Sequence, residues 1–180
     1  MADTISPMRI WLMRLAFPML AMLIAFFHLL PLSTLPSRWA PPDLLLLLAL
    51  AWVVRRPDYL PTLSIAVTFL MADLLFQRPP GLMALLVVLG CSVLKTQAQP
   101  HRETAFVGEW ISVGVVIVAI TLANRLILAM LGVVQPSLGL ILLQMVATVV
   151  AYPLMVLISQ NLLGVRKLSP ADAEALGNRR

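Results

Sequence analysis

The stretch PPDLLLLLALAWVVRRPDYLPTLSIAVTFLMADLLFQRPPG, from Pro41 to Gly81, contains two apolar runs separated by charged and turn-forming residues. The first run covers about residues 43–54 and stops at Arg55, and the second covers about 59–76. Charges, proline and glycine mark the boundaries of such runs. The stretch therefore predicts two apolar helices joined by a short cationic turn.

The composition of the whole chain places these helices in lipid. The chain has 180 residues, 61% of them hydrophobic and 12% charged, with a mean hydropathy of +0.95. Soluble domains are about 45–50% apolar and about 25% charged. A single folding unit of this length cannot hide so much apolar surface inside a water-facing core. The composition excludes a soluble globular domain and predicts one membrane domain over residues 1–180.

Segmentation of the remaining chain by the same rule gives four more apolar stretches. A membrane-spanning helix needs about 20 apolar residues, and a run of 10–14 is more often buried or re-entrant. The second and fourth stretches are short by this measure, so length alone leaves open whether they cross. The predicted helices cover about residues 11–32, 43–54, 59–76, 82–94, 107–131 and 138–165.

The distribution of cations decides in favour of six crossings. If all six helices cross, ten of the 13 Lys and Arg residues fall on the side that holds both termini, and Arg38 and Arg78 fall on the other side. Arg125 lies within the fifth helix. Cytoplasmic loops carry an excess of Lys and Arg. We therefore expect an all-α polytopic bundle of six transmembrane helices with cytoplasmic termini and a cytoplasmic tail over residues 166–180.

The net charge of +5 has a topological explanation and does not predict a nucleic-acid partner. The only cysteine, Cys91, lies in an apolar run, and the two histidines, His28 and His101, lie far apart in depth. The sequence contains no HExxH, GxSxG or glycine-rich phosphate loop. It predicts a protein that is not an enzyme, with no cofactor and no metal site.

Polar residues at membrane depth are the better candidates for function, because a charge there normally faces the protein interior and has a partner. Asp73 and Arg125 lie at similar depth near the outer ends of their helices, at a level shared by Asn124 and His28. We expect Asp73 and Arg125 to pair. The alternative, a proton or ion relay, is weak because Glu109 is the only other acid within these helices and lies 16 residues away from Arg125, at the opposite end of the fifth helix.

An ordered series of residues at helix ends and turns runs through the stretch from position 41 to position 81. The series consists of Asp43, Trp52, Arg56, Pro57, Asp73, Pro80 and Gly81. It resembles the rod shape-determining protein MreD family, in which Pro-Asp and a Leu-rich helix end in a Trp and an Arg/Pro turn. In that family an Asp-Leu pair and a Gly at the next helix follow. The residues themselves indicate structural roles: Asp43 is placed to cap its helix, and Pro57 and Gly81 are typical turn residues.

The resemblance implies a non-enzymatic scaffold in the bacterial inner membrane that belongs to the complex elongating lateral peptidoglycan. Members of the family bind MreC, a protein with one membrane helix and a periplasmic coiled coil. Through MreC they associate with MreB filaments, RodA and a class B penicillin-binding transpeptidase. The resemblance assigns the seven residues of the series to helix packing and partner docking.

Two alternatives follow from the same features. The family fold is similar to the substrate-binding S components of energy-coupling-factor vitamin transporters, which suggests a solute-binding subunit. Such a subunit needs an inward-facing polar pocket beneath an outer loop, and we expect too few polar side chains to line one. An intramembrane enzyme would lack its nucleophile and base.

Overall fold

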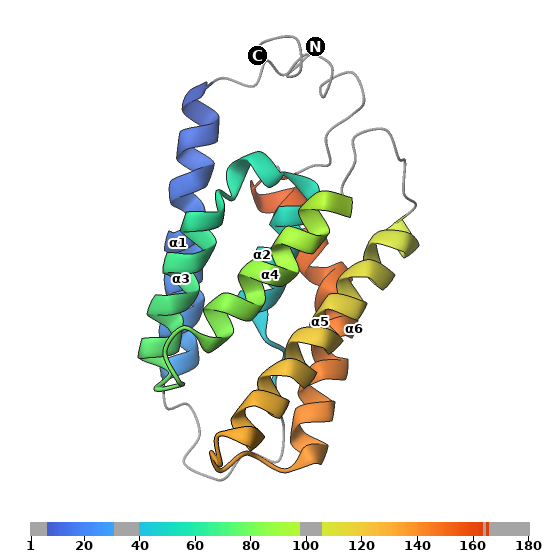
Figure 1. Cartoon of the computed structure of the whole chain (residues 1–180). Helices are drawn as coiled ribbons and strands as arrows, with labels where there is room; N and C mark the ends of the chain where they lie inside the picture. Colours follow the sequence, from blue (N-terminus) through green and yellow to red (C-terminus); the bar gives the residue numbers. More distant parts are fainter. Residues whose placement is uncertain (1–6, 31–39, 98–105, 164, 166–180) are drawn as a thin grey trace.

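The regular elements of the chain are all helical in a computed structural model that describes residues 7–30, 40–97, 106–163 and 165 (Figure 1). The predicted tail over 166–180 and His101 lie outside the described residues. The first helix begins at Pro7 and not at position 11, because proline is favoured in the first turn of a helix. The elements are α1 (Pro7–Leu29), α2 (Leu44–Arg55), the short 3-10 helix η1 (Pro57–Tyr59), α3 (Thr62–Leu75), α4 (Leu82–Gln97), α5 (Phe106–Met130) and α6 (Leu138–Leu163).

Three of the helices, α1, α5 and α6, are long and apolar enough to cross a membrane. The chain is therefore a membrane protein. The other three have 12, 14 and 16 residues. At about 1.5 Å per residue they are about 18–24 Å long, shorter than a hydrocarbon core of about 30 Å.

Successive helices run in opposite directions along one bundle (Figure 1). The start of α1 and the end of α6 lie toward the same end of it. Helix α4 contacts both α3 and α5, and α6 contacts α5 and α2. The alternation brings the starts of α2 and α6 to one end of the bundle, and the ends of these two helices to the other.

Helix α2 forms the centre of the bundle, in contact with α1, α4 and α6. Every side chain from Leu45 to Val53 is at most 5% exposed. A helix that is apolar on all faces is stable only when it is buried on all faces. The Leu-rich run that marks α2 in the sequence is thus explained by its central position.

Large apolar side chains cover the outer faces of the surrounding helices. Trp11 and Met19 on α1, Val115 on α5 and Val150 on α6 are all more exposed than buried. An apolar exterior of this extent would be unstable in water and is the expected surface of a bundle in lipid.

The α4–α5 contact depends on Gly90. A Cβ atom at this position would lie 2.8 Å from Val116 Cγ1 and 2.9 Å from Ile120 Cδ1. We expect Gly90→Val to lower the free energy of unfolding by about 1–3 kcal/mol, the usual cost of overpacking. Thermal unfolding in detergent measures this, with Gly139→Val as the control because a Cβ there meets nothing within 4 Å. Equal losses for the two variants would contradict the assignment of a close helix contact at Gly90.

Candidate functional site

The start of α2 is held by Asp43, as the sequence predicts. Its Oδ1 accepts a hydrogen bond of 3.0 Å from the backbone N–H of Leu46, which is N-cap geometry. The backbone N–H of Asp43 donates to Thr148 Oγ1 at 3.0 Å, and that hydroxyl donates to the carbonyl of Gln144 at 2.7 Å. Asp43 therefore joins the start of α2 to α6.

The other end of α2 is held by Trp52 and Arg56. The indole Nε1–H of Trp52 donates to Ser159 Oγ on α6 at 3.3 Å, and the ring is fully buried. Arg56 Nη2 donates to the hydroxyl of Tyr59 at 2.6 Å, with the guanidinium carbon 4.6 Å from the centre of the tyrosine ring. Pro57 is the first residue of η1, consistent with a turn role. These residues fix the turn between α2 and α3.

Asp73 holds the turn between α3 and α4. Its Oδ2 accepts hydrogen bonds from the backbone N–H groups of Gly81 at 3.0 Å and Ala84 at 3.3 Å. Gly81 has a φ of 87°, in the left-handed region that favours glycine. The Pro80-Gly81 part of the sequence series is thus the turn that brings backbone donors to the carboxylate.

The expected pair of Asp73 with Arg125 is wrong. Arg125 Nη1 instead donates to the carbonyl of Pro136 at 3.4 Å, and the ion pair in the described part of the chain joins Arg55 to Glu109. The reason is topological: α4 contacts both α3 and α5 and separates the two predicted partners. Similar depth does not place two side chains on facing surfaces.

Substitution of Asp73 tests its role at the turn. Asp73→Ala leaves two backbone donors without their acceptor, at a cost of about 1–3 kcal/mol in the free energy of unfolding. Asp73→Asn keeps an acceptor oxygen, so we expect a smaller loss. Thermal unfolding in detergent measures both, and Asp58→Ala at an exposed acid serves as the control. A stability loss for Asp58→Ala as large as for Asp73→Ala would show that acid removal alone accounts for the effect.

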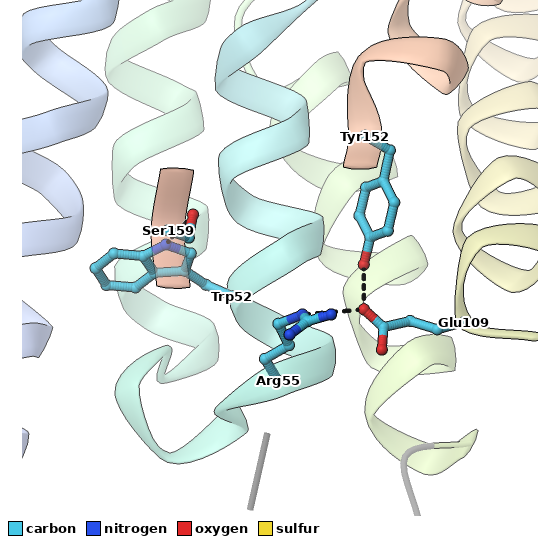
Figure 2. Close-up of polar contacts among 5 residues, drawn as sticks. All are labelled: Trp52, Arg55, Glu109, Tyr152 and Ser159. Carbon is cyan, nitrogen blue, oxygen red and sulfur yellow. Dashed lines mark hydrogen bonds and ion pairs between the residues drawn. The ribbon is translucent and has the colours of Figure 1, made fainter. Parts of the chain in front are cut away.

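A buried polar cluster that the sequence analysis missed lies at the end of α2 (Figure 2). Arg55 Nε donates to Glu109 Oε1 at 3.1 Å, and the hydroxyl of Tyr152 donates to the same oxygen at 2.8 Å. The side chains of Arg55 and Glu109 are 6% and 2% exposed. The sequence places Arg55 in the short cationic turn, and the structure makes it the buried last residue of α2.

Two adjoining cavities lie at the opposite end of the bundle, where α2 begins. The first, here called the polar cavity, has a volume of about 330 Å³ and lies among α2, the end of α5 and the start of α6. Nine of its lining residues are polar, which corrects the expectation that too few polar side chains could line such a pocket. They come from separate segments, so no single stretch of sequence shows them together. They are Asp43, Gln77, Arg78, Thr121, Asn124, Arg125, Gln135, Gln144 and Thr148.

The second cavity, here called the α1 cavity, has a volume of about 390 Å³ and lies between α1 and the start of α2. It shares Asp43, Arg78 and Gln144 with the polar cavity. His28 lines it and lies with its ring 5.0 Å from that of Phe76. Asn124 and Arg125 line the polar cavity, and His28 lines the neighbouring α1 cavity. These three residues, which the sequence places at one depth, therefore lie around adjoining cavities.

Within the described ranges, no three His, Cys, Asp or Glu side chains are close enough to hold a metal ion.

Comparisons of the chain with protein-family models, with curated proteins and with solved structures found no match. The fold and the cavities define the class of the protein: an all-helical membrane protein with a buried central helix and a polar cavity at one end of it.

Proposed function

We propose that all six helices cross the membrane and that both termini are cytoplasmic. The alternating helix directions support this topology (Figure 1). Five described cations lie at the end where α1 begins and α2 ends, whereas Arg78 and Arg125 lie at the other. An excess of cations marks the cytoplasmic side. In this arrangement the two cavities open toward the outer side.

Cysteine labelling tests this topology. In a Cys91→Ala background, Val134→Cys places an exposed thiol between α5 and α6, and Asp58→Cys places one between α2 and α3. We expect a membrane-impermeant thiol reagent to label the first in intact spheroplasts, and the second only after permeabilisation. Labelling of Asp58→Cys alone in intact spheroplasts would invert the topology, and labelling of both would reduce the number of crossings.

We propose further that the chain is a scaffold of the MreD type in the bacterial inner membrane. The observation that supports this function most directly is the placement of the series that carries the resemblance. Its members form contacts that hold the helices together. Asp43 and Trp52 are hydrogen-bonded to side chains of α6, and Asp73 accepts a hydrogen bond from the backbone N–H of Gly81. Because these residues hold the helices together, their agreement with the family series supports a similarity of fold.

The apolar exterior is suited to the proposed partner, MreC, whose single membrane helix would pack against the bundle. Helix association in lipid depends on close packing and interhelical hydrogen bonds. Through this partner the scaffold would act with MreB, RodA and a class B penicillin-binding transpeptidase in lateral peptidoglycan synthesis. The proposal requires no catalytic group from this chain.

Depletion of the protein from its native host tests the proposed function. We expect cells to lose rod shape and become round as the protein is diluted by growth, and expression of the wild-type chain to restore rods. The control is depletion with simultaneous expression of the wild-type chain, which separates loss of the protein from toxicity of the depletion system. Cells that remain rod-shaped after depletion is verified by immunoblot would contradict the proposal.

One observation favours a second candidate, a solute-binding subunit similar to the S components of vitamin transporters. The polar cavity has a volume within the range of about 300–1,000 Å³ that is usual for small-molecule sites, and it combines charged, amide and hydroxyl groups. A transport subunit of this kind would be recovered with ATP-binding cassette proteins. The scaffold would be recovered with a coiled-coil protein.

A further inference from the structure

We propose that the polar cavity and the α1 cavity together form one binding site for an anionic amphiphile. The charged head would lie in the polar cavity against Arg78 and Arg125. The apolar portion would lie in the α1 cavity. The site is argued from the cavities themselves and does not depend on the scaffold function.

The polar cavity carries a positive charge that is available to an anion. Arg125 uses Nη1 on the carbonyl of Pro136, and a guanidinium has five N–H donors. Arg78 lies with its guanidinium carbon 5.1 Å from the centre of the Phe76 ring. Stacking of this kind occupies the face of a guanidinium and leaves the N–H groups at its edge for an oxyanion. Both arginines line the same 330 Å³ space.

Two acids lie near this charge, and only one of them lines the cavities. Asp43 lines both cavities, and its Oδ1 is engaged by the first turn of α2. Asp73 is buried outside both cavities, accepts hydrogen bonds from the backbone N–H groups that begin α4 with its Oδ2, and also interacts electrostatically with Arg78. Two arginines against one lining carboxylate leave a net positive site, and guanidinium groups bind phosphate and carboxylate with charge-assisted hydrogen bonds.

The α1 cavity supplies the apolar half of the site. It is lined by Ile24 and Phe27 of α1, Leu44 and Leu45 of α2, and Phe76 at the end of α3. A soluble inorganic anion would gain nothing from such a surface, whereas a hydrocarbon group would be stabilised by it. Arg78 and Asp43 border both spaces, so one ligand can span them.

The position of the site in the bundle favours a membrane lipid as the source of the amphiphile. The cavities lie where α1, α3 and α5 end and α2 and α6 begin, which is the level of the headgroups if these helices cross the bilayer. Phe27 of α1 lines the α1 cavity and is also exposed on the outer surface of the bundle. A phosphate-bearing lipid matches both halves of the site.

Native mass spectrometry of the full chain released from detergent, after incubation with phosphatidylglycerol or phosphatidylcholine, tests this proposal. We expect the wild type to retain phosphatidylglycerol in preference to phosphatidylcholine. Arg78→Gln with Arg125→Gln should weaken retention of phosphatidylglycerol by about tenfold or more, which corresponds to about 1.4 kcal/mol of binding free energy. Arg14→Gln removes one positive charge at the opposite end of the bundle, where Arg14 Nε donates to the carbonyl of Asp58, and should leave retention unchanged.

A second variant keeps the arginines and tests the cavity itself. Thr121 lines the polar cavity, and Thr121→Phe fills part of it without altering the charge. We expect it to weaken phosphatidylglycerol retention as well, in protein that remains monodisperse and unfolds near the wild-type temperature. Retention of phosphatidylglycerol by both the double arginine variant and Thr121→Phe at the wild-type level would overturn the proposal.

Soluble anions distinguish the two sources of a phosphate group. Inorganic phosphate and glycerol phosphate should neither displace phosphatidylglycerol nor raise the unfolding temperature at concentrations where the lipid does both. Stabilisation by inorganic phosphate equal to that by the lipid would assign the cavity to a soluble anion and would contradict an amphiphile.

Discussion

Glu109→Ala is expected to lower the free energy of unfolding by about 3–5 kcal/mol, the loss that follows when one partner of a buried ion pair is removed. The substitution leaves the Arg55 guanidinium in the interior without its carboxylate and removes the acceptor of the Tyr152 hydroxyl. The loss should appear as a large decrease in unfolding temperature in detergent and in the yield of folded protein. Arg55→Met should show a similar loss, because it leaves a buried carboxylate without its cation.

The double variant separates the ion pair from general damage to the bundle. Replacement of a whole buried pair by apolar residues of similar size is often neutral or stabilising. We therefore expect Arg55→Met with Glu109→Met to recover most of the stability lost in the single variants. A double variant whose loss equals the sum of the two single losses would contradict a direct interaction between these side chains.

Trp52→Ala is the second substitution with a large expected effect. The indole is fully buried at the centre of the bundle, with its ring centre 6.0 Å from that of Phe17. Truncation of a buried Trp to Ala costs about 3–5 kcal/mol, because the cavity that remains has lost its van der Waals contacts. It also removes the donor to Ser159 Oγ. We expect a decrease in unfolding temperature comparable to that of Glu109→Ala.

Two matched variants define what Trp52 contributes. Trp52→Phe keeps an aromatic ring and loses the N–H. We expect the lost hydrogen bond to lower the free energy of unfolding by about 1 kcal/mol, and the smaller ring to add to this loss. Trp11→Ala is the same truncation as Trp52→Ala, at an exposed position on α1, and should change stability by about 1 kcal/mol or less. Equal losses of stability for Trp11→Ala and Trp52→Ala would contradict a central, buried position for α2.

Most of the fold follows from the positions of charges, proline and glycine. Arg56 and Pro57 lie between α2 and α3 at the C-cap of α2 and the start of η1, and Pro80 and Gly81 separate α3 from α4. These residues interrupt helices for local reasons, so their effect can be read from sequence alone. The N-cap of Asp43 follows from local geometry in the same way.

The polar contacts between helices could not be predicted with the same success, because they depend on which faces meet. Asp73 and Arg125 have the right depth for a pair, and α4 separates their helices. Arg55 and Glu109 also have similar depth, at the end of α2 and the start of α5, and these two do meet. Depth alone therefore does not separate the pair that forms from the pair that does not. Only the packing of α4 and α6 against α2 distinguishes them.

The polar cavity is a case in which the sequence led to an incorrect expectation. Its polar side chains are spread from position 43 to position 148 and come from helix ends and turns. Each has a local explanation by itself, such as the cap at Asp43 or the Thr148 hydroxyl bonded to Gln144. Their convergence is a property of the tertiary structure, which is why the number of polar residues per helix did not reveal it.

Affinity purification of the tagged, full-length protein from membranes of its native host tests the proposed scaffold function most directly. The measurement is the set of proteins recovered under mild detergent, compared with an untagged strain. We predict recovery of a coiled-coil protein with a single membrane helix, of the MreC type. Recovery of ATP-binding cassette subunits in place of that protein would contradict the scaffold and favour the solute-binding subunit.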